Sequence, residues 1–285
     1  MTKTFDALLK EPDILILPGA HDPLSARIAV KSGAKAVYMT GFGVAGAGFG
    51  VPDIGLVNAE QMIERVRVIA GSIAPVPLIA DGDNGHGGPL NVARLVCAYE
   101  QSGAQCIQLE DQVSPKRCGH MEGKEVIPLA EAAAKIRAAS EARSSSSFKI
   151  MARTDARATH DLDEALRRGE AFLKAGADIL FIEAPRSEDE LIKVATTFSG
   201  TPLVANLVED GKTPMLSPQA LQQMGYKIAL YPISALLAAS AALERVYAQL
   251  LGTKAEARAR VTFQQYNEIV GLPDLLATAK RFDTK

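Results

Sequence analysis

The segment Lys116-Arg117-Cys118-Gly119-His120 has the residue types of a reactive thiol site. Two cations and an imidazole surround the cysteine, and nearby positive charge lowers the pKa of a thiol by favouring its thiolate form. The glycine gives this loop the freedom to move. We therefore expect Cys118 to be catalytic, with Lys116 and His120 setting the charge around it.

A second polar stretch lies upstream, between Asp81 and Gly88. Asp81, Asp83 and Asn84 place oxygen ligands on a glycine-rich loop. Hard cations such as Mg²⁺ bind one or two carboxylates and keep other positions for water or substrate. His86 is expected to be a loop residue beside the metal, because oxygen ligands suit Mg²⁺ better. A divalent metal beside a mobile cysteine loop indicates an enzyme that acts on small anions.

Eight short apolar runs can supply the strands that position these loops. They span residues 14–17, 36–39, 76–80, 106–109, 148–152, 179–182, 202–205 and 228–231. Four of the runs follow helical stretches that end in glycine, as expected for the αβ half of a βαβ unit. This alternation predicts an α/β fold, a (β/α)₈ barrel. A doubly wound open sheet is the alternative, but no Gly-x-Gly-x-x-Gly loop follows the first run.

Polar residues follow nearly every run, where a barrel of this type has its catalytic face. They are Tyr38, Thr40, Gly41, Asp81, Asp83, Glu110, Arg153, Glu183 and Asn206. Each residue alone is a weak signal. Their shared position at strand ends predicts one common site.

The composition excludes several other classes of protein. The net charge of −2 over 285 residues gives no basic surface for nucleic acid or an anionic membrane. Three cysteines without framework spacing argue against a disulfide scaffold. The N-terminus lacks an apolar signal core, and no apolar run approaches the roughly 20 residues that span a bilayer. We therefore expect a cytoplasmic protein.

The chain divides into two unequal parts. We expect residues 1–250 to form the catalytic barrel, since no long linker interrupts them. Residues 251–285 have a helical pattern broken at Pro273, with no further strand. This C-terminal extension is expected to pack on a neighbouring subunit.

Taken together, these motifs resemble the isocitrate lyase/phosphoenolpyruvate mutase superfamily. Residues 116–120 are similar to the Lys-Lys/Arg-Cys-Gly-His signature of its lyase branch. Further matches follow in order at residues 38–41, 51–53, 81–83, 109–112, 152–157 and 211–214. The resemblance covers nearly the whole chain. It implies a (β/α)₈ barrel, Mg²⁺ with Mn²⁺ as a substitute, and a homotetramer built from dimers that exchange their last barrel helix.

The resemblance also implies roles for individual residues. Asp81 would hold Mg²⁺, with Asp83 and Glu110 binding it directly or through water. The residues implied in substrate binding are Thr40, Gly41, Phe42, Asp53, Arg153, Glu183, Asn206 and Thr213. Arg153 could instead form a structural ion pair with Asp155 or with Glu183.

The chemistry that these groups suit is the reversal of an aldol or Claisen addition. The substrate would be a small 2-hydroxy di- or tricarboxylic acid of the 2,3-dimethylmalate or 2-methylisocitrate type, cleaved into a 2-oxo acid (pyruvate or glyoxylate) and a carboxylate. Mg²⁺ would stabilise charge on the 2-oxo acid oxygen, and Cys118 would protonate the carbanion as general acid. Tyr38 is a candidate base, although a phenol with a pKa near ~10 needs cations nearby. An ordinary barrel tyrosine is the alternative.

Other activities remain compatible with these motifs. They are the phosphonomutases that act on carboxyphosphonoenolpyruvate or phosphoenolpyruvate, hydrolysis or decarboxylation of oxaloacetate, and a non-catalytic barrel that binds a small acid. Pro232 disfavours the oxaloacetate hydrolases, which tend to have a hydroxyl residue there. Leu237 stands where methylisocitrate-cleaving relatives carry arginine, which disfavours a third substrate carboxylate.

Overall fold

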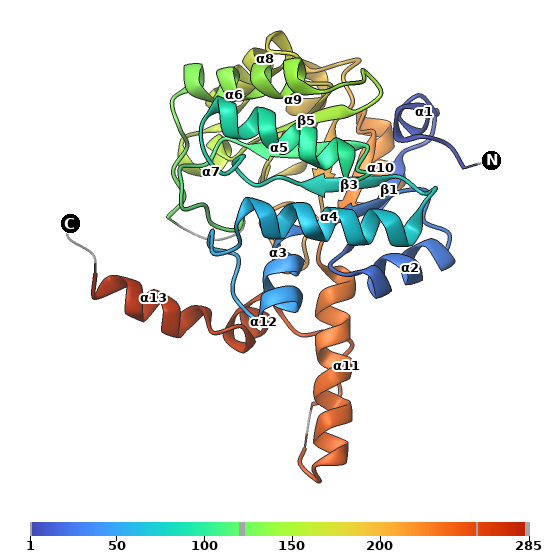
Figure 1. Cartoon of the computed structure of the whole chain (residues 1–285), viewed down its shortest axis with the longest axis vertical. Coiled ribbons are helices and arrows are strands. Elements are labelled where there is room, and N and C mark those ends of the chain that lie inside the picture. Colours follow the sequence, from blue (N-terminus) through green and yellow to red (C-terminus); the bar gives the residue numbers. More distant parts are fainter. Residues whose placement is uncertain (1, 120–122, 255, 283–285) are drawn as a thin grey trace.

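Eight parallel strands form a single barrel in the computed structural model, which describes residues 2–119, 123–254 and 256–282 (Figure 1). The strands are β1 (Leu15–Ala20), β2 (Val37–Met39), β3 (Leu78–Asp81), β4 (Cys106–Glu110), β5 (Lys149–Thr154), β6 (Ile179–Ile182), β7 (Val204–Asn206) and β8 (Ile228–Tyr231). Their order is β6-β5-β4-β3-β2-β1-β8-β7, and a parallel bridge from Leu180 to Leu203 joins the outer two. The barrel is thus nearly closed, and the predicted (β/α)₈ fold is confirmed.

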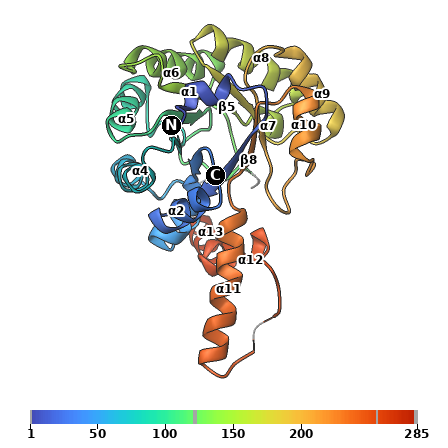
Figure 2. The same ribbon diagram turned by 90° about the vertical axis from the view of Figure 1, so that its right-hand side faces the viewer.

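Helices surround the barrel (Figure 2). They are α1 (Phe5–Leu9), α2 (Pro23–Lys31), α3 (Gly41–Gly43), the π-helical turn η1 (Val44–Gly48), α4 (Ala59–Ile73), α5 (Pro89–Gln101), α6 (Leu129–Ala142), α7 (Ala156–Thr159), α8 (Leu162–Lys174), α9 (Glu188–Thr197), α10 (Pro218–Met224), α11 (Ser234–Leu250), α12 (Phe263–Ile269) and α13 (Leu272–Lys280). Within the described ranges, none of them combines the length and the apolar character needed to cross a membrane.

Local signals explain where the elements begin and end. Asp22 caps α2 by accepting a hydrogen bond from the Ser25 amide, with Pro23 at the first helical position. The four glycines expected after helices all have positive φ angles, which glycine adopts without steric cost. Each predicted apolar run contains or overlaps one strand, displaced by a few residues at most.

Apolar side chains fill the barrel interior, so a substrate can bind only at the carboxyl ends of the strands. Leu17, Ile79, Met151 and Phe181 belong to one buried cluster contributed by different strands, and Phe5 of α1 packs into the same cluster. A larger apolar layer lies between the strands and the surrounding helices. These two layers hold the strands rigidly, so the groups that follow their carboxyl ends are fixed in position.

The C-terminal part of the chain leaves the barrel and then returns to it. Helix α11 projects away from the barrel (Figures 1 and 2) and exposes apolar residues at helical spacing, namely Leu243, Val246, Tyr247 and Leu250. The chain then turns back, and the Val261 amide donates a hydrogen bond to the Leu237 carbonyl at 3.1 Å. Within this chain, α12 packs on Phe42 through the Tyr266 ring, and packing of the extension on a neighbouring subunit stays a prediction.

Candidate active site

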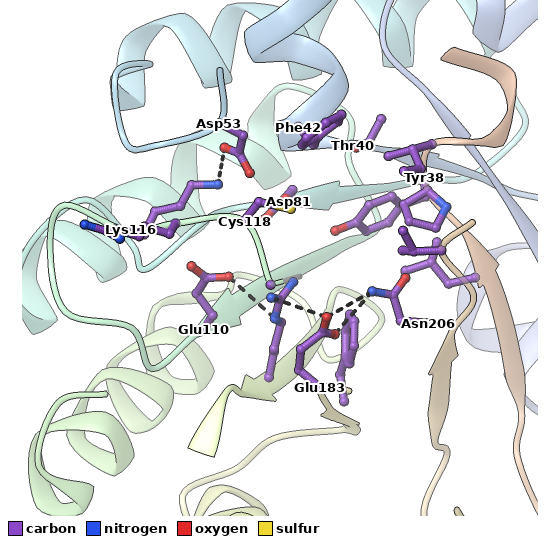
Figure 3. A pocket seen from close by; sticks show the side chains of 18 of the residues that line it. Tyr38, Thr40, Phe42, Asp53, Asp81, Glu110, Lys116, Cys118, Glu183 and Asn206 are labelled. Atoms are coloured by element: carbon purple, nitrogen blue, oxygen red, sulfur yellow. Dashed lines mark hydrogen bonds and ion pairs between the residues drawn. The ribbon is translucent and has the colours of Figure 1, made fainter. Parts of the chain in front are cut away.

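The carboxyl ends of the strands surround a pocket (Figure 3). The predicted residues that line it are Tyr38, Thr40, Phe42, Asp53, Asp81, Glu110, Lys116, Cys118, Arg153, Glu183 and Asn206. Asp81, Glu110 and Asn206 are the last residues of β3, β4 and β7. Because parallel strands end at the same rim, residues far apart in the sequence meet at one site.

Asp81 is held from several sides. Its Oδ1 accepts hydrogen bonds from the Asp83 amide at 3.0 Å and from Gln108 Nε2 at 3.1 Å, and its Oδ2 accepts one from the Gly41 amide at 3.2 Å. A Cβ on residue 41 would lie 2.7 Å from Asp81 Oδ2, so only glycine allows this approach. Burial and then the charge of Asp83 raise the pKa of Asp81 to about 6. This carboxylate therefore favours the presence of a cation.

Lys116 neutralises two buried carboxylates. Its Nζ contacts Asp53, as the dashed line in Figure 3 shows, and lies 2.7 Å from Asp83 Oδ1 as an ion pair rather than an aligned hydrogen bond. Burial opposes the ammonium charge, but Asp53 and then Asp83 raise the pKa of Lys116 well above its ordinary value. Lys116 Nζ thus pairs with the carboxylates of Asp53 and Asp83, whereas the sequence predicts that Lys116 tunes Cys118.

The buried side chain of Glu110 indicates whether a metal ion would fit this site. Its Oε1 is buried and has no hydrogen-bond partner in the described ranges, and its Oε2 lies 3.6 Å from Arg153 Nε. Burial raises the pKa of Glu110 well above the ordinary range. No three acidic, histidine or cysteine side chains of the described residues already form a metal cluster. The oxygen donors of Asp81 and Glu110, one of them unpartnered, nevertheless fit Mg²⁺ with water completing its coordination.

Arg153 is fixed by a buried acid that supports it from behind. Its Nε and Nη2 donate to the two oxygens of Asp155 at 2.9 and 3.1 Å, and its guanidinium lies over the Phe181 ring at 5.1 Å from the centroid. Glu183 Oε1 is 3.9 Å from Nη2, and Asn206 Nδ2 donates to Glu183 Oε2 at 3.2 Å (Figure 3). The ion pair with Asp155 that the sequence left open is therefore present, and Arg153 still lines the pocket.

The cysteine loop lies directly over this cluster. Cys118 is half-buried in the pocket wall, and its amide donates to the Asp53 carbonyl at 3.1 Å. A Cβ on Gly119 would lie 2.3 Å from Arg153 Nη2 and 2.5 Å from Glu183 Oε1, so a larger residue here would displace these two side chains. His120, also predicted as a catalytic residue, lies outside the described residues.

Lys124 is a buried residue that the sequence analysis missed. Its Nζ donates to the Gly119 carbonyl and, at 2.7 Å, to Asp155 Oδ1. One ammonium group thus links the backbone beside Cys118 to the carboxylate that holds Arg153. No local sequence pattern predicts this role for Lys124, because a lysine in a polar loop is usually exposed to solvent.

Tyr38 and Gln108 form a hydrogen-bonded pair below the pocket. Tyr38 Oη donates to Gln108 Oε1 at 2.6 Å. Burial, followed by the charge of Asp81, raises the pKa of Tyr38 well above its ordinary value. The phenol therefore donates to Gln108 in this structure, and its role as a base stays a prediction. Gln108 was missed, although a polar residue within the apolar run 106–109 was an available signal.

The remaining predicted residues are Thr40, Phe42 and Thr213, and they differ in how they are placed relative to the pocket. Thr40 caps α3, where its Oγ1 accepts from the Gly43 amide at 3.3 Å. Phe42 faces the pocket and stacks on Phe263 of α12, a lining residue that the sequence analysis missed. Thr213 is buried but is not among the residues that line the pocket.

A parallel barrel with carboxylates, an arginine and a thiol at the carboxyl ends of its strands has the arrangement of a (β/α)₈ barrel enzyme. The family model described as phosphoenolpyruvate phosphomutase matches residues 5–251. The chain belongs to this family, and the predicted superfamily resemblance is confirmed.

Relatives and solved structures agree with this assignment. The 2,3-dimethylmalate lyase of Eubacterium barkeri is 42% identical over 97% of this chain and 96% of its own. The 2-methylisocitrate lyase of Bacillus subtilis (strain 168) is 40% identical over 85% and 79%. A crystal structure of 2,3-dimethylmalate lyase matches with a TM-score of 0.84 and 35% identity, covering 96% of this chain and 92% of that one. Oxaloacetate acetylhydrolase in complex with 3,3-difluorooxalacetate matches with a TM-score of 0.85 and 33% identity, covering 100% and 97%.

One further neighbour bears on the metal. A phosphonopyruvate hydrolase was solved in complex with oxalate and Mg²⁺, and it matches with a TM-score of 0.77 and 30% identity over 97% of both chains.

Proposed function

We propose that this chain is a carbon–carbon lyase that cleaves a 2-hydroxy dicarboxylate of the 2,3-dimethylmalate type into a 2-oxo acid and a second carboxylate. The observation that carries the proposal is that Cys118, Asp81, Glu110 and Arg153 all line one pocket. The 42% identity with 2,3-dimethylmalate lyase along nearly the whole of both chains supports this substrate type.

Different pocket residues have different roles in the proposed cleavage. Arg153 is held in place by Asp155 and presents its charge to a substrate carboxylate. Tyr38 stays a neutral phenol and positions Gln108, which in turn orients Asp81. The substrate hydroxyl gives its proton to a carboxylate of the pocket, the carbon–carbon bond breaks, and its electron pair stays on the carbon beside the departing carboxylate. Cys118 donates its proton to that carbon.

The proposal includes Mg²⁺, with Mn²⁺ as a substitute. Asp81 would bind the ion directly, and Glu110 directly or through water. Asp83 would act through water, because its Oδ1 is paired with Lys116. Bound Mg²⁺ supplies Lewis-acid stabilisation of negative charge on the oxygen of the 2-oxo acid. Titration calorimetry with Mg²⁺ tests the site: wild type should bind the ion and Asp81→Ala should not, with both proteins equally folded by circular dichroism.

The activity is tested by product detection with Mg²⁺ and a panel of acids. The panel contains 2,3-dimethylmalate, 2-methylisocitrate, isocitrate, oxaloacetate and phosphonopyruvate. Release of pyruvate from 2,3-dimethylmalate is the expected result, and Cys118→Ser should abolish it while Mg²⁺ still binds. Full turnover by Cys118→Ser would remove the thiol from the mechanism. Cleavage of oxaloacetate alone, or conversion of phosphonopyruvate alone, would replace the proposal.

Pro232 favours the lyase over oxaloacetate hydrolysis. Its side chain lines the pocket, and a proline ring has no hydroxyl group to offer a substrate. This matters because oxaloacetate acetylhydrolase is among the closely similar folds.

We also propose that the chain forms a homotetramer of dimers that exchange α11, the last helix of the barrel region 1–250. Support comes from the apolar face of α11, whose residues Val246 and Leu250 are 51% and 75% exposed, and from Ile16 on β1, which is 51% exposed in the barrel wall. A paired Val246→Asp and Leu250→Asp variant should have a lower mass than wild type by light scattering. An unchanged mass would contradict the exchange.

A further inference from the structure

One wall of the pocket is apolar and comes partly from outside the barrel. Phe42, Val208, Ile233 and Phe263 line this wall, whereas the charged groups come from the ends of β3 to β6, from the cysteine loop and from Asp53. Phe263 is the first residue of α12, in the C-terminal extension. Its ring stacks on Phe42 with the centroids 5.3 Å apart and an interplanar angle of 22°. We call Phe42 and Phe263 the aromatic wall.

Several independent contacts hold the aromatic wall in place. Arg260 binds both oxygens of Asp210 at 2.8 and 3.1 Å, immediately before α12 begins. Thr262 caps α12, and the Tyr266 ring lies against Phe42 with a centroid distance of 5.1 Å. Any side chain at Gly46 would collide with the hydroxyl of Tyr266. The position of Phe263 is therefore fixed by polar, capping and packing contacts together.

The aromatic wall is adjacent to the thiol. Cys118 packs against the apolar cluster that contains Phe42, Val208 and Ile233, and Phe263 packs against the same cluster. The substrate carbon that receives the proton from Cys118 therefore lies beside an apolar surface. A substituent on that carbon points toward aromatic rings, where an alkyl group loses water favourably and a carboxylate loses hydration without a cation in return.

We infer that the aromatic wall is a binding subsite for a small alkyl substituent on the carbon that Cys118 protonates, and that Phe263 determines specificity for it. This inference rests on the proposed lyase function. It assigns the substrate class as 2-hydroxy dicarboxylates with a methyl or ethyl group on carbon 3. One methylene in an apolar pocket typically changes kcat/KM by about 10–200-fold.

The test compares four acids that all release pyruvate and differ only at carbon 3. They carry hydrogen (2-methylmalate), methyl (2,3-dimethylmalate), ethyl (3-ethyl-2-methylmalate) or carboxymethyl (2-methylisocitrate). Wild type should prefer methyl over hydrogen by about 10–200-fold in kcat/KM. Phe263→Ala should reduce this ratio at least fivefold and shift the preference toward ethyl, while Phe263→Leu should keep most of the ratio. Phe263→Arg should raise the relative kcat/KM for carboxymethyl.

Matched controls separate specificity from folding. Phe282→Ala removes a 75% exposed ring from the same extension and should keep the wild-type ratio. If Phe263→Ala lowers kcat/KM for all four acids by the same factor, or leaves the methyl-to-hydrogen ratio unchanged, the subsite does not exist. If wild type releases pyruvate from none of the acids, the lyase proposal fails and the subsite assignment falls with it. Pyruvate release without any preference at carbon 3 overturns the subsite alone.

Discussion

Lys124 allows a quantitative test of how the cysteine loop is held over the site. The variant Lys124→Met keeps the length of the side chain and removes its charge. Asp155 would retain Arg153 as a partner, so no buried carboxylate is left alone. The Gly119 carbonyl would lose its hydrogen bond from the ammonium group. Hydrogen bonds with a charged partner contribute about 1.5–3 kcal/mol.

If that hydrogen bond forms only when Cys118 is in place over the substrate, its loss lowers kcat and kcat/KM together by roughly 10- to 150-fold. Steady-state pyruvate release measures both constants, and urea unfolding measures stability. Lys124→Arg should recover part of kcat because it keeps the charge. Lys193→Met is the matched control, because Lys193 forms an exposed ion pair with Asp163. A Lys124→Met enzyme whose kcat stays within threefold of wild type would refute the reasoning.

Three further predictions concern the carboxylates and the phenol. Lys116→Met leaves two buried carboxylates without their cation and should lower the free energy of unfolding in urea by about 3–5 kcal/mol; a loss below 1 kcal/mol would show that the ion pairs are dispensable. Gly41→Ala places a methyl group 2.7 Å from Asp81 Oδ2 and should weaken Mg²⁺ binding in calorimetry with little change in Tm; unaltered affinity would contradict the close approach. Tyr38→Phe should lower kcat by about tenfold or less, the size of one neutral hydrogen bond, without moving the pH profile; loss of the rise in kcat with increasing pH would restore the phenol as a base.

The sequence alone determined the scaffold and the position of the chemistry within it. Short apolar runs that follow helix-ending glycines are local signals, since burial of a strand and the φ angle of a turn depend on neighbouring residues. Once the strands are parallel and closed, residues that end them must share a rim. This is why the sequence places Asp81, Glu110 and Arg153 together.

The motif around Cys118 was equally readable, because its residues are consecutive. Composition also carried information, since a nearly neutral chain excludes a strongly basic binding surface. The family resemblance was confirmed by the match over residues 5–251. Substrate roles for the individual residues stay predictions.

Only the tertiary structure decided which charge pairs with which. Lys116 could have faced the thiol, but the loop carries its ammonium group to Asp53 and Asp83. Lys124 joins the Gly119 carbonyl to Asp155, a link that no spacing in the sequence predicts. Phe263 reaches the pocket because the chain turns back after α11. Such contacts join residues that are far apart in the sequence, so they depend on how the whole chain folds. A local sequence pattern therefore does not predict them.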